Sequence, residues 1–282
     1  MSQPKVAIVT DWLTHKGGSE RVVVSLHKTF PTATIFTSVY EPDTLLAEDF
    51  KDITVQTTWL QKLPRPIRKL HKLFPLMRVK AFRDLDLSDY DIIISSTGAE
   101  AKQVRKTRKD QVHICYCYTP IRYYWSHYDE YRKNPGLGKL NWIAKIAMPL
   151  MVPALRKADF NAAQDVDQFI AISTVIQERI KKYYKKDSIV IHPPVDISRF
   201  HKYSLAADKR QGYLAHGRQV PYKKVDLAIR ACNALRLPLT VSGSGSEHEH
   251  LKSIAGNTVT FQTGLSDEAV AKLFGSVKGY IF

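Results

Sequence analysis

The sequence has few cysteines, and their spacing does not suit a metal site or a disulfide framework. There are three, Cys115, Cys117 and Cys232, an odd number without the paired spacing of zinc ligands. Cys115 and Cys117 stand two apart in a strand-like run, so their side chains point to one face of that strand. We interpret them as small core residues in a reducing compartment.

Long hydrophobic runs are also lacking. The longest apolar stretch, Trp142–Leu155, is interrupted by Lys145, Pro149 and Pro153, and no run reaches the roughly 18 residues of a membrane-spanning helix. Lys5–Thr10 is too short for the core of a signal peptide, and no small-residue cleavage site follows it. We therefore expect a cytoplasmic protein, with peripheral contact to the inner face of the cell membrane left open.

Several sequence signatures of enzymes are absent. There is no zinc signature, P-loop or nucleophile elbow, and the carboxylates form no evident acid/base pair. The histidines His15, His113, His127 and His216 are isolated, which is typical of structural histidines. No internal repeat or low-complexity tract occurs, so a repeat protein is excluded.

Positive charge is abundant. The chain carries 42 Lys and Arg against 27 Asp and Glu, a net charge of +15, while 44% of its residues are hydrophobic. Such a chain should fold around a core and be attracted to polyanions. A nucleic-acid-binding protein is one alternative, but its basic residues should form one stripe within a recognisable module. Here they are spread over several segments.

Short β-branched runs alternate with segments of helical period, which predicts an α/β fold with parallel sheets. At 282 residues the chain is long enough for two domains. A first group of strands is predicted at Val6–Thr10, Ala33–Ser38, Asp91–Ser95, Val112–Cys117 and Phe169–Ile172.

The run Pro193-Pro194-Val195-Asp196 predicts an extended connection to a second domain. We place the domains at residues 1–200 and 201–282. Strands are then predicted at Tyr213–His216, Leu239–Ser242, Val259–Thr263 and Tyr280–Phe282, with helices from Val225 to Leu235 and over Asp267–Phe274. A doubly wound half usually has about six strands, so four predict that the chain ends within a sheet.

The segment Pro64–Arg83 is basic and amphipathic. Ile67, Leu70, Leu73, Phe74 and Met77 recur near helical spacing among arginines and lysines, and Pro75 should kink or end the first helix. The segment predicts either contact with an anionic membrane or a core-packing helix with a solvated basic face.

Two glycine-containing motifs follow predicted strands. Gly17-Gly18 precedes a helix starting near Ser19, a plausible N-cap. Gly217-Arg218 follows a strand directly, and Lys223 and Lys224 open the next helix. Glycine lets the backbone approach a ligand, and a helix N-terminus with cationic side chains suits an anion. A tight turn or a solvated helix start would explain the same residues.

Two further segments are less specific. Ser242-Gly243-Ser244-Gly245-Ser246 lies between a strand and a helix, as phosphate-binding loops do, although a tight turn explains it equally. Tyr118-Thr119-Pro120 leads into Arg122-Tyr123-Tyr124-Trp125. These aromatic side chains could line a sugar cleft or form an interior cluster.

Together these segments resemble the family 4 glycosyltransferases over nearly the whole chain. The most specific match is Gly217–Ile229, which resembles the family's Gly-Arg…Lys donor-diphosphate motif. Asp11–Val22 resembles its amino-terminal glycine loop. Further matches lie at Ile172–Phe200, Leu239–Gly245 and Val259–Gly264.

The resemblance implies a GT-B fold of two facing Rossmann-like domains, with the acceptor on the first and the nucleotide sugar on the second. It implies retaining transfer, with no metal or other cofactor. Arg218 and Lys223 would stabilise the departing diphosphate as catalytic residues, with Lys224 as the alternative to Lys223. The implied donor-binding residues are Gly17, Gly18, Gly217, Lys224, Gly243, Gly245 and Tyr118.

Two departures from the family pattern matter. Tyr118 stands where the family often has histidine. Tyrosine has a similar planar shape but a pKa of about 10, so we expect it to contact the donor more readily than to transfer a proton. The family's Glu-x7-Glu motif should follow Tyr280–Phe282 and is absent. We therefore expect this chain to be a fragment that is inactive alone.

The finer function stays open at this level. Arg122–Trp125 resembles a mannosyltransferase-like branch, which implies a role in envelope polysaccharide or glycolipid synthesis with a glycan or lipid-linked acceptor. The alternatives are a nucleotide-sugar epimerase of the same fold, the nucleic-acid-binding protein considered above, or a binding remnant.

Overall fold

In the computed structural model, the chain is described over residues 3–15, 17–42, 50–133 and 141–282, without the side chains of residues 143 and 144. It forms two compact units, residues 1–194 and 195–282. Residues 195–200, which the sequence-based division assigns to the first domain, thus belong to the second unit.

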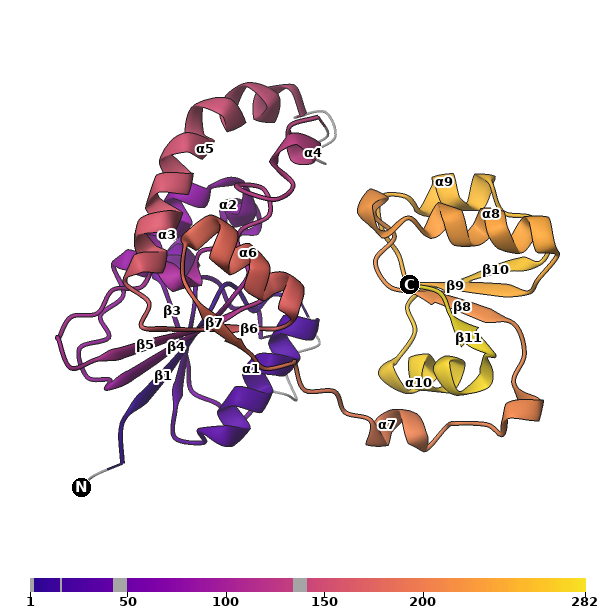
Figure 1. Cartoon of the computed structure of the whole chain (residues 1–282), viewed down its shortest axis with the longest axis horizontal. Helices are drawn as coiled ribbons and strands as arrows, with labels where there is room; N and C mark the ends of the chain where they lie inside the picture. The colour runs from indigo at the N-terminus through magenta and orange to yellow at the C-terminus, as the bar shows by residue number, and fades with distance from the viewer. Residues whose placement is uncertain (1–2, 16, 43–49, 134–140) are drawn as a thin grey trace. The chain divides into compact units, whose positions relative to one another are not determined.

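The first unit is a seven-stranded parallel sheet with helices on both faces (Figure 1). Its strand order is β3-β2-β1-β4-β5-β6-β7, so the order reverses between β1 and β4. Its elements are β1 (Val6–Thr10), α1 (Gly18–Thr29), β2 (Thr34–Thr37), β3 (Val55–Thr57), η1 (Trp59–Lys62), α2 (Arg65–Lys69), η2 (His71–Leu73), α3 (Pro75–Arg83), β4 (Ile92–Thr97), η3 (Ala101–Gln103), β5 (Val112–Cys117), α4 (Tyr128–Lys133), α5 (Asn141–Gln164), β6 (Gln168–Ala171), α6 (Thr174–Tyr184) and β7 (Ser188–Val190).

Both faces of this sheet are buried at its centre, which explains why β1 is a continuous run of apolar and β-branched residues. Ile8 of β1 packs with Val23 of α1 on one face. Val9, its neighbour in the chain, packs with Phe82 of α3 on the other. Cys115 packs into the cluster between α5 and α6, so the interpretation of this thiol as a core residue is confirmed.

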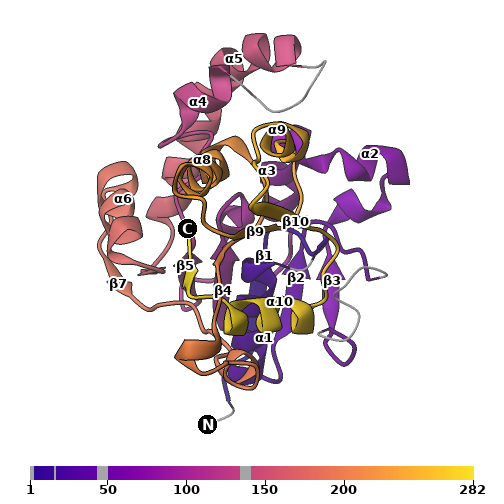
Figure 2. The ribbon, with the colours of Figure 1, turned by 90° about the vertical axis from the view of Figure 1, so that its right-hand side faces the viewer.

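The second unit is a four-stranded parallel sheet with the order β10-β9-β8-β11 (Figure 1). Helices α8 and α9 cover one face and α10 the other (Figures 1 and 2). Its elements are α7 (Ser198–His201), η5 (Ala207–Lys209), β8 (Tyr213–His216), η6 (Pro221–Lys223), α8 (Val225–Leu235), β9 (Leu239–Ser242), α9 (His248–Ser253), β10 (Val259–Gln262), α10 (Asp267–Ser276) and β11 (Gly279–Tyr280).

The predicted strands are all present. The bounds of β1, β5, β8 and β9 are as predicted, and the ends of the others differ by at most two residues. The sequence did not reveal β3 or β7, because three residues are too few to show a period. The expected helix break at Pro75 is placed differently. The first helix ends at Lys69, and Pro75 begins α3, where its missing amide costs nothing.

The polar stretch 201–210 is part of the packed second unit. The amide of Leu205 donates to the carbonyl of Gly275 at 3.0 Å, and the ring of Phe200 meets that of Phe274 edge-on at 5.5 Å. A side chain at Gly275 would place its Cβ 2.0 Å from the Tyr203 carbonyl oxygen. The segment therefore lies directly against α10 and is not a free linker.

Candidate functional site

In each unit, candidate residues follow the carboxyl ends of strands at or next to the point where the strand order reverses. Open α/β sheets bind ligands at this position. In the first unit the strands are β1 and β4, and in the second they are β8 and β11.

In the second unit, the loops after β8 and β9 are fastened together. The amide of Gly217 donates to the carbonyl of Ser242 at 3.0 Å, and that of Gln219 to Ser244 at 2.9 Å. A Cβ at Gly243 would lie 2.2 Å from the Gly217 carbonyl oxygen, and one at Gly245 equally close to that of Gln219. Gly243 and Gly245 are therefore required by the contact between the loops, whatever binds beside them.

The predicted cationic residues lie on this double loop. Arg218 is exposed, and its guanidinium donates to the Tyr222 hydroxyl at 3.2 Å. The Lys223 ammonium lies 4.3 Å from the centroid of the Phe282 ring. Lys224 is held in the left-handed region at φ 51° and caps α8. The structure thus brings Arg218, Lys223 and Gly217 to the same end of the sheet.

Sequence reasoning missed the buried contact between Gln219 and His248 beneath this loop. Gln219 is 1% exposed, and its side chain contacts the carbonyl of Gly243 and the ring of His248. Nearby, His216 Nδ1 and the Ser242 hydroxyl lie 2.7 Å apart and join the ends of β8 and β9. A polar residue that follows an exposed arginine carries no sequence signal of burial, so neither contact could be predicted.

In the first unit, Asp11 directly follows β1 and holds the loop after β4. Its carboxylate accepts a hydrogen bond from the Thr97 hydroxyl at 2.6 Å. It also accepts hydrogen bonds at 2.9–3.0 Å from the amides of Gly98, Ala99 and Ala101. Burial raises the pKa of Asp11 above its usual value in spite of these bonds. The carboxylate thus fixes the shape of this edge.

The glycine loop leads into α1. Gly17 is the N-cap, and the helix begins at Gly18. The expectation that Ser19 caps the helix is wrong, because Ser19 already lies inside the first turn and its hydroxyl donates to the Glu20 carboxylate at 2.8 Å. A Cβ at Gly18 would meet no atom within 4 Å. Internal packing therefore does not require glycine at position 18.

Tyr118 lies close to the same turn. Its hydroxyl donates to the carbonyl of Ser19 at 3.1 Å and lies 2.6 Å from the Ser96 hydroxyl. Burial raises the pKa of Tyr118 well above its usual value. The hydroxyl is therefore protonated at neutral pH and joins α1 to the ends of β4 and β5.

The aromatic side chains after β5 form an interior cluster. The hydroxyls of Tyr123 and Tyr124 donate to the Glu100 carboxylate at 2.8 and 2.9 Å, and the indole of Trp125 donates to Asp159 at 2.7 Å. Of the two alternatives for these three side chains, the structure supports internal packing over a sugar cleft.

Two buried ion pairs anchor the loop after β4. Arg78 pairs with Glu100, and Lys102 pairs with Asp159, with every side chain at most 2% exposed. Burial alone would raise the pKa of Glu100, but the Arg78 charge and the hydrogen bonds hold it below its usual value. The Arg78–Glu100 pair is therefore ionised at neutral pH.

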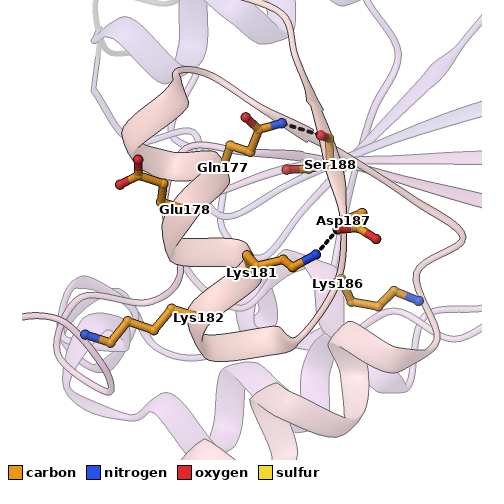
Figure 3. A pocket seen from close by; sticks show the side chains of 7 residues that line it. All are labelled: Gln177, Glu178, Lys181, Lys182, Lys186, Asp187 and Ser188. Atoms are coloured by element: carbon orange, nitrogen blue, oxygen red, sulfur yellow. Dashed lines mark hydrogen bonds and ion pairs between the residues drawn. The ribbon is translucent and has the colours of Figure 1, made fainter.

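A surface pocket of about 440 Å³ lies elsewhere in the first unit, between the second half of α6 and the start of β7 (Figure 3). Lys181 pairs with Asp187 there at 2.5 Å. Since Ser188 begins its strand, the pocket is at the amino edge of the sheet, opposite the candidate residues. Its other lining residues are Gln177, Glu178, Lys182 and Lys186.

Within the described ranges, no group of three or more His, Cys, Asp or Glu side chains is arranged to hold a metal ion. Among the same residues, no helix has both the length and the apolar character to cross a membrane.

Comparison with known proteins gives a consistent result. The family model described as Glycosyltransferase Family 4 matches residues 16–199. No curated protein matches the chain in sequence. Solved structures share its fold at low identity, and three of them serve as examples.

HepE from Anabaena, solved with UDP and glucose, is 15% identical, with a TM-score of 0.59 over 98% of this chain and 73% of its own. AviGT4, a glycosyltransferase of avilamycin A biosynthesis, is 16% identical, with a TM-score of 0.51 over 99% and 69%. A UDP-glucosyltransferase from Polygonum tinctorium is 9% identical, with a TM-score of 0.50 over 99% and 75%. The α/β architecture with two parallel sheets is that of the GT-B glycosyltransferases.

Proposed function

This chain belongs to Glycosyltransferase Family 4 and is a glycosyltransferase, and from that premise we propose that its second unit binds a nucleoside-diphosphate sugar. The glycosyl group, which we propose to be mannose, passes to a glycan or lipid-linked acceptor bound by the first unit. The product would serve the synthesis of an envelope polysaccharide or glycolipid. We propose that the anomeric configuration is retained.

The main support for this proposal is the double loop, that is, the two hydrogen-bonded loops after β8 and β9. Arg218 and Lys223 project cationic groups at the end of the sheet, and a guanidinium binds phosphate oxygens with two parallel donors. In the described part of the chain, the main-chain amides of Arg218 and Gly245 have no hydrogen-bond acceptor. Backbone amides and side-chain cations together suit a diphosphate.

The proposed reaction breaks the bond between the anomeric carbon and the diphosphate oxygen. A bond forms between that carbon and an acceptor hydroxyl, whose proton ends on the released diphosphate. Arg218 and Lys223 would stabilise the charge that develops on the leaving group. Since these two cations can neutralise the diphosphate, we propose that transfer needs no metal.

The test uses a panel of UDP-, GDP- and dTDP-sugars with glycan and lipid-linked acceptors. In an active enzyme that contains this chain, we expect a new glycosidic product with one donor class, the donor's anomeric configuration by NMR, and full activity in EDTA. Conversion of the nucleotide sugar without an acceptor would indicate an epimerase instead. Binding of no nucleotide by the chain would contradict the proposed donor site.

We also propose that the first unit rests on an anionic membrane. Ile67, Leu70, Phe74 and Leu76 are between 40% and 51% exposed, so these residues of the amphipathic segment do not pack into the core. The exposed basic residues among them are Arg65, Lys69, Lys72 and Lys80. Apolar side chains between cations suit the interface of an anionic bilayer, such as the cytoplasmic leaflet.

The start of α5 offers a second apolar stripe on the same unit. Trp142, Ile146 and Leu150 follow one another at intervals of four residues, on one face of the helix. They are 64%, 60% and 77% exposed. A membrane contact of this unit would bring a lipid-linked acceptor to the side that we assign to the acceptor.

A further inference from the structure

Gln219 has every polar group of its backbone and side chain bonded to the loop after β9 or to the first residue of α9. Its amide donates to Ser244 and its carbonyl accepts from the amide of Glu247, at 2.9 and 3.0 Å. Its side-chain amide donates to the carbonyl of Gly243 at 2.9 Å, and its Oε1 lies 2.6 Å from Nδ1 of His248. One residue thus makes four hydrogen bonds between two loops.

The direction of the last bond follows from the others. Because the nitrogen of the Gln219 amide faces the Gly243 carbonyl, its oxygen faces His248 and must accept. His248 therefore carries its proton on Nδ1. Its ring also meets Phe261 edge-on at 5.6 Å, a second contact that restricts the imidazole.

We propose that Gln219, held by His248, is a positioning residue for the donor diphosphate. This inference rests on the proposed function. Neither side chain would touch the ligand. Gln219 is buried, while Arg218 before it is exposed, so anchoring Gln219 directs Arg218 outward at the end of the sheet.

The effect on binding is one of preorganisation. A loop that is already held in its bound shape loses little conformational entropy when the ligand arrives. The tether keeps the amides of Arg218 and Gly245 on two loops in one fixed arrangement. Without it, the loops would have to be ordered by the ligand, and affinity for the diphosphate would fall.

The experiment measures the affinity of the whole chain for UDP and GDP by titration calorimetry, together with the melting temperature. Gln219→Met keeps the length of the side chain but removes both of its hydrogen bonds. Asn233→Leu is the matched control. The amide of Asn233 also joins two segments of this unit, through the carbonyl of Ile254 and the amide of Gly256, but near the end of α8 that lies away from Arg218.

We expect Gln219→Met to weaken binding of the nucleotide about tenfold, and Asn233→Leu to lower the melting temperature while affinity stays within twofold. His248→Phe removes the same tether from its other end and keeps the ring, and we expect a loss of about threefold. The double variant should bind no more weakly than Gln219→Met, since both changes break one connection.

The outcomes separate the two proposals. If the parent binds neither UDP nor GDP, the donor site itself is wrong. If the parent binds and Gln219→Met or, should that variant not fold, His248→Phe binds within twofold of it, the positioning role is wrong. An equal loss of affinity in Asn233→Leu would also overturn it, because the effect would then be one of general stability.

Discussion

Arg78 and Glu100 form a two-pronged ion pair in the interior of the first unit. The Nε of Arg78 lies 2.8 Å from one carboxylate oxygen and its Nη2 lies 3.0 Å from the other. The pair joins α3 to the loop after β4, which Asp11 holds from the other side. Buried charged groups therefore hold the loop after β4 in place at this edge of the sheet.

Replacing Glu100 by Gln should destabilise the first unit by about 3–5 kcal/mol, because Arg78 would stay buried without its counter-charge. Chemical denaturation would measure the loss. As a control, Asp84→Asn removes the exposed pair with Lys80 and should change stability little. Equal effects of the two substitutions would contradict a structural role of the buried pair.

The buried imidazole of His113 should make stability depend on pH. Burial lowers its pKa to about 4, whereas the unfolded chain takes up the proton near 6.5. The contribution of His113 to the free energy of unfolding is therefore complete above about pH 6.5. It falls as the pH drops toward 4, by up to about 1.4 kcal/mol per pH unit. Denaturation at several pH values should show a flatter slope for His113→Gln. A slope equal to that of the parent would exclude His113 as the source.

Gly18→Ala should distinguish a role of Gly18 in ligand binding from a role in internal packing. The added methyl would meet no atom within 4 Å, so the melting temperature should equal or slightly exceed that of the parent. If the glycine loop approaches the ligand, transfer should fall at least about tenfold, because the Cβ would occupy the space of the ligand. Parental activity in this variant would contradict the assigned role of the loop.

In an active enzyme that contains this chain, Arg218→Ala should lower transfer on the order of 10²-fold, since a preorganised cation at the leaving group contributes that much or more. The rate of Arg218→Lys should lie between those of the parent and Arg218→Ala, because lysine keeps the positive charge but cannot donate two parallel hydrogen bonds to a phosphate. Arg230→Ala, which removes an exposed arginine of α8, is the control and should leave the rate unchanged. Rates of Arg218→Ala within threefold of the parent would contradict the assignment.

The membrane proposal predicts a salt-sensitive flotation of the chain with anionic liposomes and little with neutral ones. Leu70→Glu should abolish it. Val175→Glu places the same charge at a 54% exposed site of α6 and should have no effect. Equal binding to neutral liposomes, or an equal effect of the two substitutions, would exclude the proposed surface.

The sequence already predicted most of the framework on which these experiments depend. Strand β1 carries an unbroken run of β-branched or apolar residues, and helix α8 has a clear amphipathic period, so local pattern was enough to locate them. It also singled out the glycines and the Arg218 motif. The short strands β3 and β7 were not predicted, because their stability comes from the neighbouring strands and not from their own residues.

The details of the candidate site belong to the tertiary structure. The sequence left open whether Tyr123 and Tyr124 face a cleft or the interior, and the decision came from Glu100, which lies 23 and 24 residues away in the chain. Gln219 and His248 are 29 residues apart and look like ordinary loop residues. Hydrogen bonds between distant loops depend on the packing of whole strands and helices.

What the sequence by itself determined is therefore the order of strands and helices and the positions where glycine and positive charge follow a strand, because these depend on residues close together in the chain. Only the tertiary structure decided which polar groups are buried and which partners satisfy them. The physical reason is that a buried donor or charge is tolerated only beside a partner, and folding brings that partner from a distant part of the chain.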